Sequence, residues 1–187
     1  MISHKLKQLP ITNIKSISLL AMLSALSVAG RIVCAGIPNV QPMTDIVIIT
    51  ALVMGTRFGV LNAVLTIIAS NLFLGMGIWT LPQIFSLTMV ALLTGVCIRP
   101  LLKRIPLWLM SIYAGFTGLL YGLCISVVQA PIFGVDYLFQ YYIAGLPFDL
   151  MHAAGNVVFY YVLAPILIPL LEKLLNKYLE DLSSCRN

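Results

Sequence analysis

The chain has 187 residues, of which 60% are hydrophobic and 9% are charged, and its mean hydropathy is +1.03. This composition excludes an ordinary soluble domain and predicts a single all-α integral membrane domain that covers residues 1–187. The net charge of +5 is interpreted as a signal of orientation in the bilayer, so no nucleic-acid partner is expected. The four cysteines form no CxxC pair and no metal-ligand spacing, and we assign them no role.

Apolar segments separated by prolines and charges predict six transmembrane helices, at residues 14–36, 44–56, 58–78, 82–98, 106–130 and 147–171. Lysines precede the first segment, as in a signal peptide, but its apolar stretch is longer than a typical signal core, so we expect a retained span. The apolar run of the second segment reaches only about 15 Å as a helix, half the hydrocarbon thickness. We therefore expect the polar start of this segment to be covered by protein and not by lipid.

Positive charge decides between five and six spans. With six spans and a cytoplasmic N-terminus, ten of the eleven Lys and Arg residues face the cytoplasm and only Arg31 lies outside. Without the second span every later loop changes side, and the division becomes three against eight. The positive-inside rule thus predicts six spans with both termini cytoplasmic.

The predicted outer connections are "RIVCAGIPNVQPMTD", "LGMGIWTLP" and "QAPIFGVDYLFQYYIAGLPFD". They are rich in glycine, proline, aromatic and amide side chains, which suit an uncharged or mixed organic ligand better than a metal ion. Four aromatic residues of these connections are candidate ligand contacts, with an interfacial aromatic belt as the open alternative: Trp79, Tyr137, Tyr141 and Tyr142.

Single polar residues near the outer ends of the first and third spans are further candidates. Arg31 is predicted to contact the ligand or an internal partner, the alternative being a side chain that reaches the lipid headgroups. Asn71 lies close to two glycines, where backbone approaches a ligand closely, whereas Asn62 is expected to hydrogen-bond between helices. We expect Asp45 to cap the second helix.

Asp149, His152 and Asn156 have the spacing i, i+3 and i+7, so they share one face of the last span. Ionisable groups inside membranes are rare and usually face a cavity or the bundle interior. A ligand-facing role and a structural role that fastens the sixth helix both remain open.

The first span carries an alanine at every fourth position, Ala21, Ala25 and Ala29, which gives a smooth face for close helix approach. Residues 37–85 add three landmarks, the turns "NVQP" and "GTRFG" and the stretch "SNLFLGMGIWTLPQ". With this combination the chain resembles the S components, the substrate-binding subunits, of energy-coupling factor (ECF) vitamin transporters. Among them it looks most like the cobalamin-specific ones.

The resemblance implies an S-component-like bundle that binds a vitamin, cobalamin (vitamin B12) by closest likeness, at its outer side. Toppling in the plasma membrane of a prokaryote would deliver it inward. The alanine face would dock on a transmembrane coupling protein that sits on two ATPases. ATP and Mg belong to those partners, and no cofactor of the chain's own is implied. Together with the polar candidates named above, the amides of the outer connections are expected to meet those of the ligand: Asn39, Gln41, Gln83, Gln129 and Gln140.

The chain has no GxxxxGK[ST] phosphate loop, so any ATP hydrolysis must come from partners. A membrane hydrolase based on Asp149 and His152 lacks a recognisable nucleophile or metal set, and we expect a transport subunit and not an enzyme. The alternatives are an autonomous secondary transporter of a small organic molecule, an S component for another vitamin or precursor, and a purely structural protein.

Overall fold

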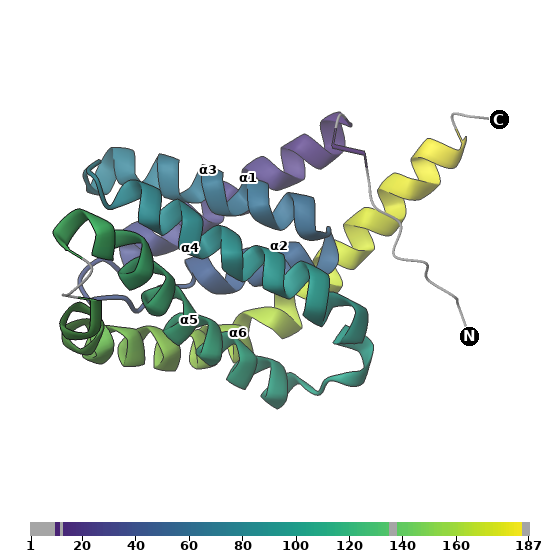
Figure 1. Ribbon diagram of the computed structural model, residues 1–187. Helices are drawn as coiled ribbons and strands as arrows, with labels where there is room; N and C mark the ends of the chain where they lie inside the picture. The colour runs from purple at the N-terminus through teal and green to yellow at the C-terminus, as the bar shows by residue number, and fades with distance from the viewer. Residues whose placement is uncertain (1–9, 12, 135–137, 185–187) are drawn as a thin grey trace.

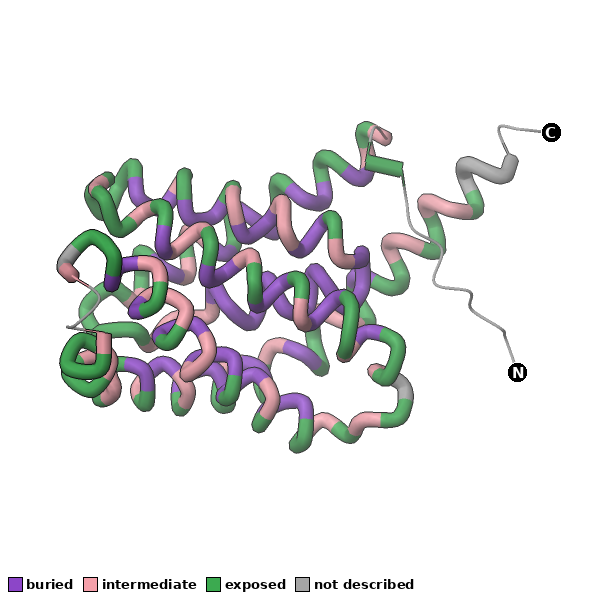
Figure 2. Tube along the Cα trace, in the orientation of Figure 1, coloured by how far each residue is buried: buried purple, intermediate pink, exposed green. Residues whose placement is uncertain are grey.

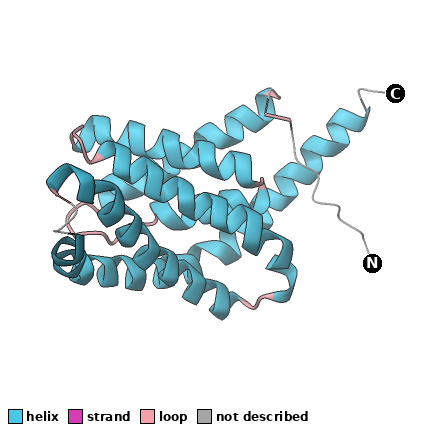
Figure 3. Ribbon diagram, viewed as in Figure 1, coloured by secondary structure: helices cyan, strands magenta, loops and turns pink. Residues whose placement is uncertain are grey.

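The structure, a computed structural model, describes residues 10–11, 13–134 and 138–184, with the side chains at 103, 133 and 181–184 left out of that description. The described residues form helices joined by short turns, without strands (Figure 3). The six α-helices are α1 (Ile14–Val33), α2 (Met43–Val53), α3 (Thr56–Leu74), α4 (Thr80–Leu93), α5 (Leu107–Phe133) and α6 (Leu138–Ser184). They assemble into one bundle, and the predicted all-α membrane fold is confirmed (Figure 1).

The short helix α2 forms the centre of the bundle. Its 11 residues extend over about 16 Å, and all of them are buried (Figure 2). The other five helices each contact α2. Unlike α2, these five are long and apolar enough to cross a bilayer, when α4 is counted together with the turns after it. Protein therefore covers α2 on every side, as expected for a segment too short to face lipid along a whole span.

Both ends of α2 lie in protein, so its unpaired backbone groups need partners there. At its C-terminal end the buried Arg99 donates from Nε to the carbonyl oxygen of Leu52, at 2.9 Å, and from Nη2 to that of Val53, at 3.5 Å. Capping by Asp45 was the wrong prediction for the other end, because α2 begins at Met43 with Pro42 at the cap position. Asp45 instead lies in the first turn, fully buried, and neither of its side-chain oxygens has a hydrogen-bond partner among the described residues.

The turn between α2 and α3 brings the two helices into close contact. Gly55 has a φ of 110°, which a residue with a side chain rarely adopts. One turn later a Cβ on Gly59 would lie 2.9 Å from the Cα of Ala51, so only glycine fits this crossing. Asn62 confirms the predicted interhelical hydrogen bond, because it accepts from Ser24 in α1 and donates to Thr50 in α2.

Segment ends differ most from prediction in the second half of the chain. The α-helical part of α4 ends at Leu93 and continues as a π-helical turn over Thr94–Ile98 and a 3-10 turn over Arg99–Arg104. The last helix begins at Leu138, not at residue 147, and ends at Ser184 beyond the predicted 171. Pro147 lies inside it because neighbouring helices in a membrane bundle can satisfy the carbonyl that a proline leaves free.

The two ends of the bundle differ. The end of α1 and the starts of α2, α4 and α6 gather at one end, on the left in Figure 1. At the other end lie the start of α1 and the last turns of α6, which project beyond the other helices. The positive-inside rule predicts that the first of these ends is the outer one.

Candidate functional site

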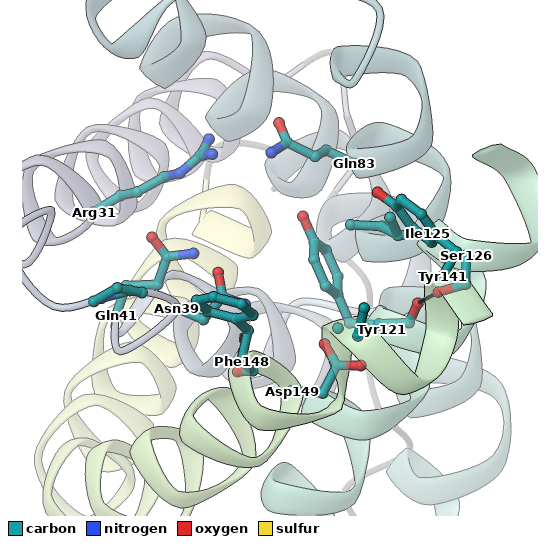
Figure 4. Close-up of a pocket in the computed structure, with 14 residues that line it drawn as sticks. Arg31, Asn39, Gln41, Gln83, Tyr121, Ile125, Ser126, Tyr141, Phe148 and Asp149 are labelled. Carbon is teal, nitrogen blue, oxygen red and sulfur yellow. Dashed lines mark hydrogen bonds between the residues drawn. The ribbon is translucent and has the colours of Figure 1, made fainter. Parts of the chain in front are cut away.

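A cavity of about 550 Å³ opens at the predicted outer end of the bundle. Its wall comes from the end of α1, the connection between α1 and α2, the start of α4, the second half of α5 and the first half of α6 (Figure 4). The volume lies within the range of about 300–1,000 Å³ that is usual for small-molecule sites. The lining residues are Arg31, Pro38, Asn39, Gln41, Gln83, Tyr121, Gly122, Ile125, Ser126, Tyr141, Ala144, Gly145, Phe148 and Asp149.

The residues predicted as ligand contacts divide between this wall and its surroundings. Those that line the cavity are Arg31, Asn39, Gln41, Gln83, Tyr141 and Asp149. Those that lie elsewhere are Asn71, Trp79, Gln129, Gln140, Tyr142, His152 and Asn156. The remaining candidate, Tyr137, lies outside the described residues.

Arg31 is 8% exposed and is fixed by uncharged partners on α3. Its Nη1 donates to Ser70 Oγ at 2.5 Å and to Asn71 Oδ1 at 2.9 Å. Asn71 in turn donates from Nδ2 to Gln83 Oε1 at 2.9 Å and to Thr80 Oγ1 at 3.0 Å. A single buried amide behind the cavity wall thus contacts one side chain from α1 and two from α4.

The "NVQP" turn supplies the next part of the wall. Asn39 has a φ of 58°, and asparagine tolerates this left-handed conformation better than most residues. Its Nδ2 donates to the carbonyl oxygen of Phe148 at 3.3 Å, which joins the connection between α1 and α2 to α6. Gln41 follows two residues later and also faces the cavity.

Helices α5 and α6 form the opposite wall. The hydroxyl of Tyr141 donates to Gln129 Oε1 and joins the two helices near the mouth. Deeper in, the carboxylate of Asp149 lies against Gly122, where a Cβ would overlap it. Figure 4 shows Tyr121 between this carboxylate and Arg31.

His152 and Asn156 bind other helices below the cavity. Thr44 Oγ1 lies 2.9 Å from His152 Nε2, and Asn156 Nδ2 donates to the carbonyl oxygen of Ala114 at 3.1 Å. Both side chains are almost fully buried. One face of α6 therefore places Asp149 at the cavity, His152 against α2 and Asn156 against α5. For His152 and Asn156 this corresponds to the structural alternative, in which polar groups fasten the last helix to its neighbours.

Two aromatic candidates lie outside the cavity lining. Trp79 is 45% exposed, and its ring occupies the space that a Cβ on Gly77 would need. Tyr142 is half-buried. Both positions suit the interfacial belt that was the alternative for them.

Sequence reasoning missed Tyr121, Ser126 and Phe148. A signal exists for Ser126, because Ser126 and Gln129 are three residues apart and share one face of α5. Tyr121 is five residues before Ser126, a spacing that does not place it on the same face. Phe148 carries no such signal, since an aromatic residue next to Asp149 reads equally well as lipid-facing.

The alanine face of α1 points away from the bundle. Ala21, Ala25 and Ala29 are all exposed, whereas the leucines at 19, 20 and 23 pack inward. Within the described part of the chain, no other helix covers this face.

Residues 15–164 match the family model described as ECF transporter, substrate-specific component. No curated protein and no solved structure gives a significant match. The family match and the apolar helices make this a multi-pass membrane protein and a transport subunit that works with components of the ECF module. The match extends over well more than half of the chain, and the chain therefore belongs to the substrate-specific components of ECF transporters.

Proposed function

We propose that this chain binds a vitamin in the outer cavity and carries it inward by toppling, powered by a coupling protein and two ATPases. The observation that carries the proposal is the cavity itself, in which amides, hydroxyls, a guanidinium and a carboxylate converge at one end of a membrane bundle. Polar groups that converge on one cavity beside apolar and aromatic side chains are typical of a site for a small organic molecule.

Cobalamin is the first candidate substrate. The sequence landmarks in residues 37–85 favour it, and the wall offers Asn39, Gln41 and Gln83 to a ligand that carries many amides. A corrinoid is larger than a 550 Å³ cavity, so it would extend through the mouth and contact the connection between α1 and α2.

The exposed alanine face is the proposed contact with the coupling protein. Small side chains let two helices approach closely within a membrane, where van der Waals packing drives association. Ala25, at the centre of the face, is the position where added bulk would separate the two helices most.

Uptake into proteoliposomes tests the substrate. The vesicles contain this chain, the coupling protein and both ATPases, with or without internal ATP. We expect labelled cobalamin to enter only with ATP and to be competed by excess cobalamin but not by riboflavin or folate. An assembled, ATP-hydrolysing complex without cobalamin uptake would exclude cobalamin, and uptake without the ATPases would favour an autonomous transporter.

Co-purification tests the docking face. Ala25→Trp should reduce recovery of the coupling protein at least about 10-fold and leave substrate binding by the isolated chain unchanged. The matched control is Ile112→Trp, at an exposed apolar position on α5, a helix without significant contact with α1. Equal recovery with both variants would place docking on another face.

A further inference from the structure

The charge of Arg31 is buried without an opposite charge beside it. Its hydrogen bonds at Nη1 go to a hydroxyl and an amide, and among the described residues no carboxylate forms an ion pair with it. A guanidinium has five N–H donors, so those on Nε and Nη2 remain for the cavity that Arg31 lines. Burying an unpaired charge is costly, and an anionic group placed in the cavity would offset that cost.

Gln83 adds a second donor at the same place. Its Oε1 accepts from Asn71 Nδ2, which turns the amide so that its NH2 group is the end left for a ligand. Figure 4 shows Gln83 close to the guanidinium of Arg31 on the same side of the cavity. Asn71 holds both residues, accepting from one and donating to the other, so it is the positioning residue of this subsite.

Asp149 supplies the opposite character on the other wall. It is 6% exposed and lines the cavity, with its carboxylate against Gly122. Tyr121 lines the cavity between the two (Figure 4). The cavity therefore has a donor-rich positive wall and an accepting negative wall separated by one aromatic ring.

We infer that the substrate carries an anionic oxygen group, a phosphate or a carboxylate, that binds Arg31 and Gln83, and an N–H or O–H donor that binds Asp149. The inference rests on the proposed function, because it assigns the chemistry of the ligand in the same cavity. It makes Arg31 the residue that selects charged substrates over uncharged ones of the same shape.

Matched pairs of probes test this selection on the purified chain in nanodiscs, by calorimetric binding. The pairs are cobalamin and cobinamide, pantothenate and panthenol, and pyridoxal phosphate and pyridoxal. Within each pair only the first carries the anionic group, and both members keep hydrogen-bond donors. Cobinamide also lacks the ribose and base that accompany the phosphate of cobalamin, so the pantothenate and pyridoxal pairs are the ones matched in shape. We expect the anionic member of at least one pair to bind at least about 10-fold more tightly than its partner.

Three variants separate selection from a structural role. Arg31→Gln should bring the affinity ratio of that pair close to one, and Arg31→Lys should retain part of it. Asn71→Asp should also abolish the ratio, because its carboxylate would neutralise Arg31 from inside the wall. Arg57→Gln, at an exposed arginine on α3, is the control and should leave the ratio unchanged.

The outcomes distinguish the inference from the proposed function. Equal binding of both members in every pair that the wild type binds would overturn the inference alone, as would an unchanged ratio in Arg31→Gln and Asn71→Asp. An equal loss for both members would make Arg31 a purely structural residue and would also overturn it. Binding of none of the six probes by a chain that still assembles with the ECF module would overturn both the inference and the vitamin substrate.

Discussion

Arg99 holds the C-terminal end of α2, and its removal should destabilise the whole bundle. In Arg99→Met the aliphatic stem remains, but the carbonyl oxygens of Leu52 and Val53 lose a charged donor at 2.9 and 3.5 Å. Hydrogen bonds to charged groups contribute about 1.5–3 kcal/mol, and a buried carbonyl left unpaired costs about 1–3 kcal/mol. The two figures describe the same lost contact and are not added together, so we expect the free energy of unfolding to fall by about 2–3 kcal/mol.

The measurement is reversible unfolding in mixed bicelles on titration with a denaturing detergent. Arg57→Met is the matched control, because Arg57 is an exposed arginine in the first turn of α3. It should change the free energy of unfolding by less than about 0.5 kcal/mol. Equal effects of the two variants would refute the capping role, and Arg99→Lys should recover part of the loss by restoring one charged donor.

Three other substitutions test packing and the cavity wall. Asn62→Ala removes two interhelical hydrogen bonds and should lower the free energy of unfolding by about 1–3 kcal/mol in the same titration. Gly59→Val meets the backbone of α2 and should cost about 1–3 kcal/mol or more, whereas Gly36→Val, with open space around it, should be nearly neutral. Gly122→Ala should displace the Asp149 carboxylate, weakening substrate binding about 10-fold in calorimetry while stability changes little, since a flexible side chain can move aside.

The helical class and most of the spans could be predicted from the sequence, because apolar length is a direct requirement of the bilayer. The central position of α2 could also be anticipated, since a segment that is too short and begins with polar residues must be covered by protein. The residue that caps the C-terminal end of α2 could not be predicted. Arg99 lies 46 residues beyond Val53 in the sequence, and a basic residue near the predicted inner face is equally well explained as an orientation signal.

The candidate site was partly predictable for a related reason. Polar residues in apolar spans point inward, but the pattern does not say whether they meet a ligand or another helix. His152 bonds to Thr44, and Asn71 lies one layer behind the residues that line the cavity. These assignments depend on contacts between helices distant in the chain, which helical spacing within one segment does not determine.

Helix α1 connects the two proposed activities of the chain. Its outward face carries Ala21, Ala25 and Ala29, and Arg31, two residues after the last alanine, turns inward to α3 and the cavity. The coupling protein would contact one face of α1, and the substrate would contact Arg31 near its C-terminal end. Both contacts would therefore act on the position of α1 relative to α3.

If docking shifts α1, the contacts of Arg31 with Ser70 and Asn71 change, and the affinity for an anionic substrate changes with them. By linkage, the substrate must then alter docking affinity by the same factor. The weak point of such a coupling is the amide of Asn71, since it hydrogen-bonds to both Arg31 and Gln83.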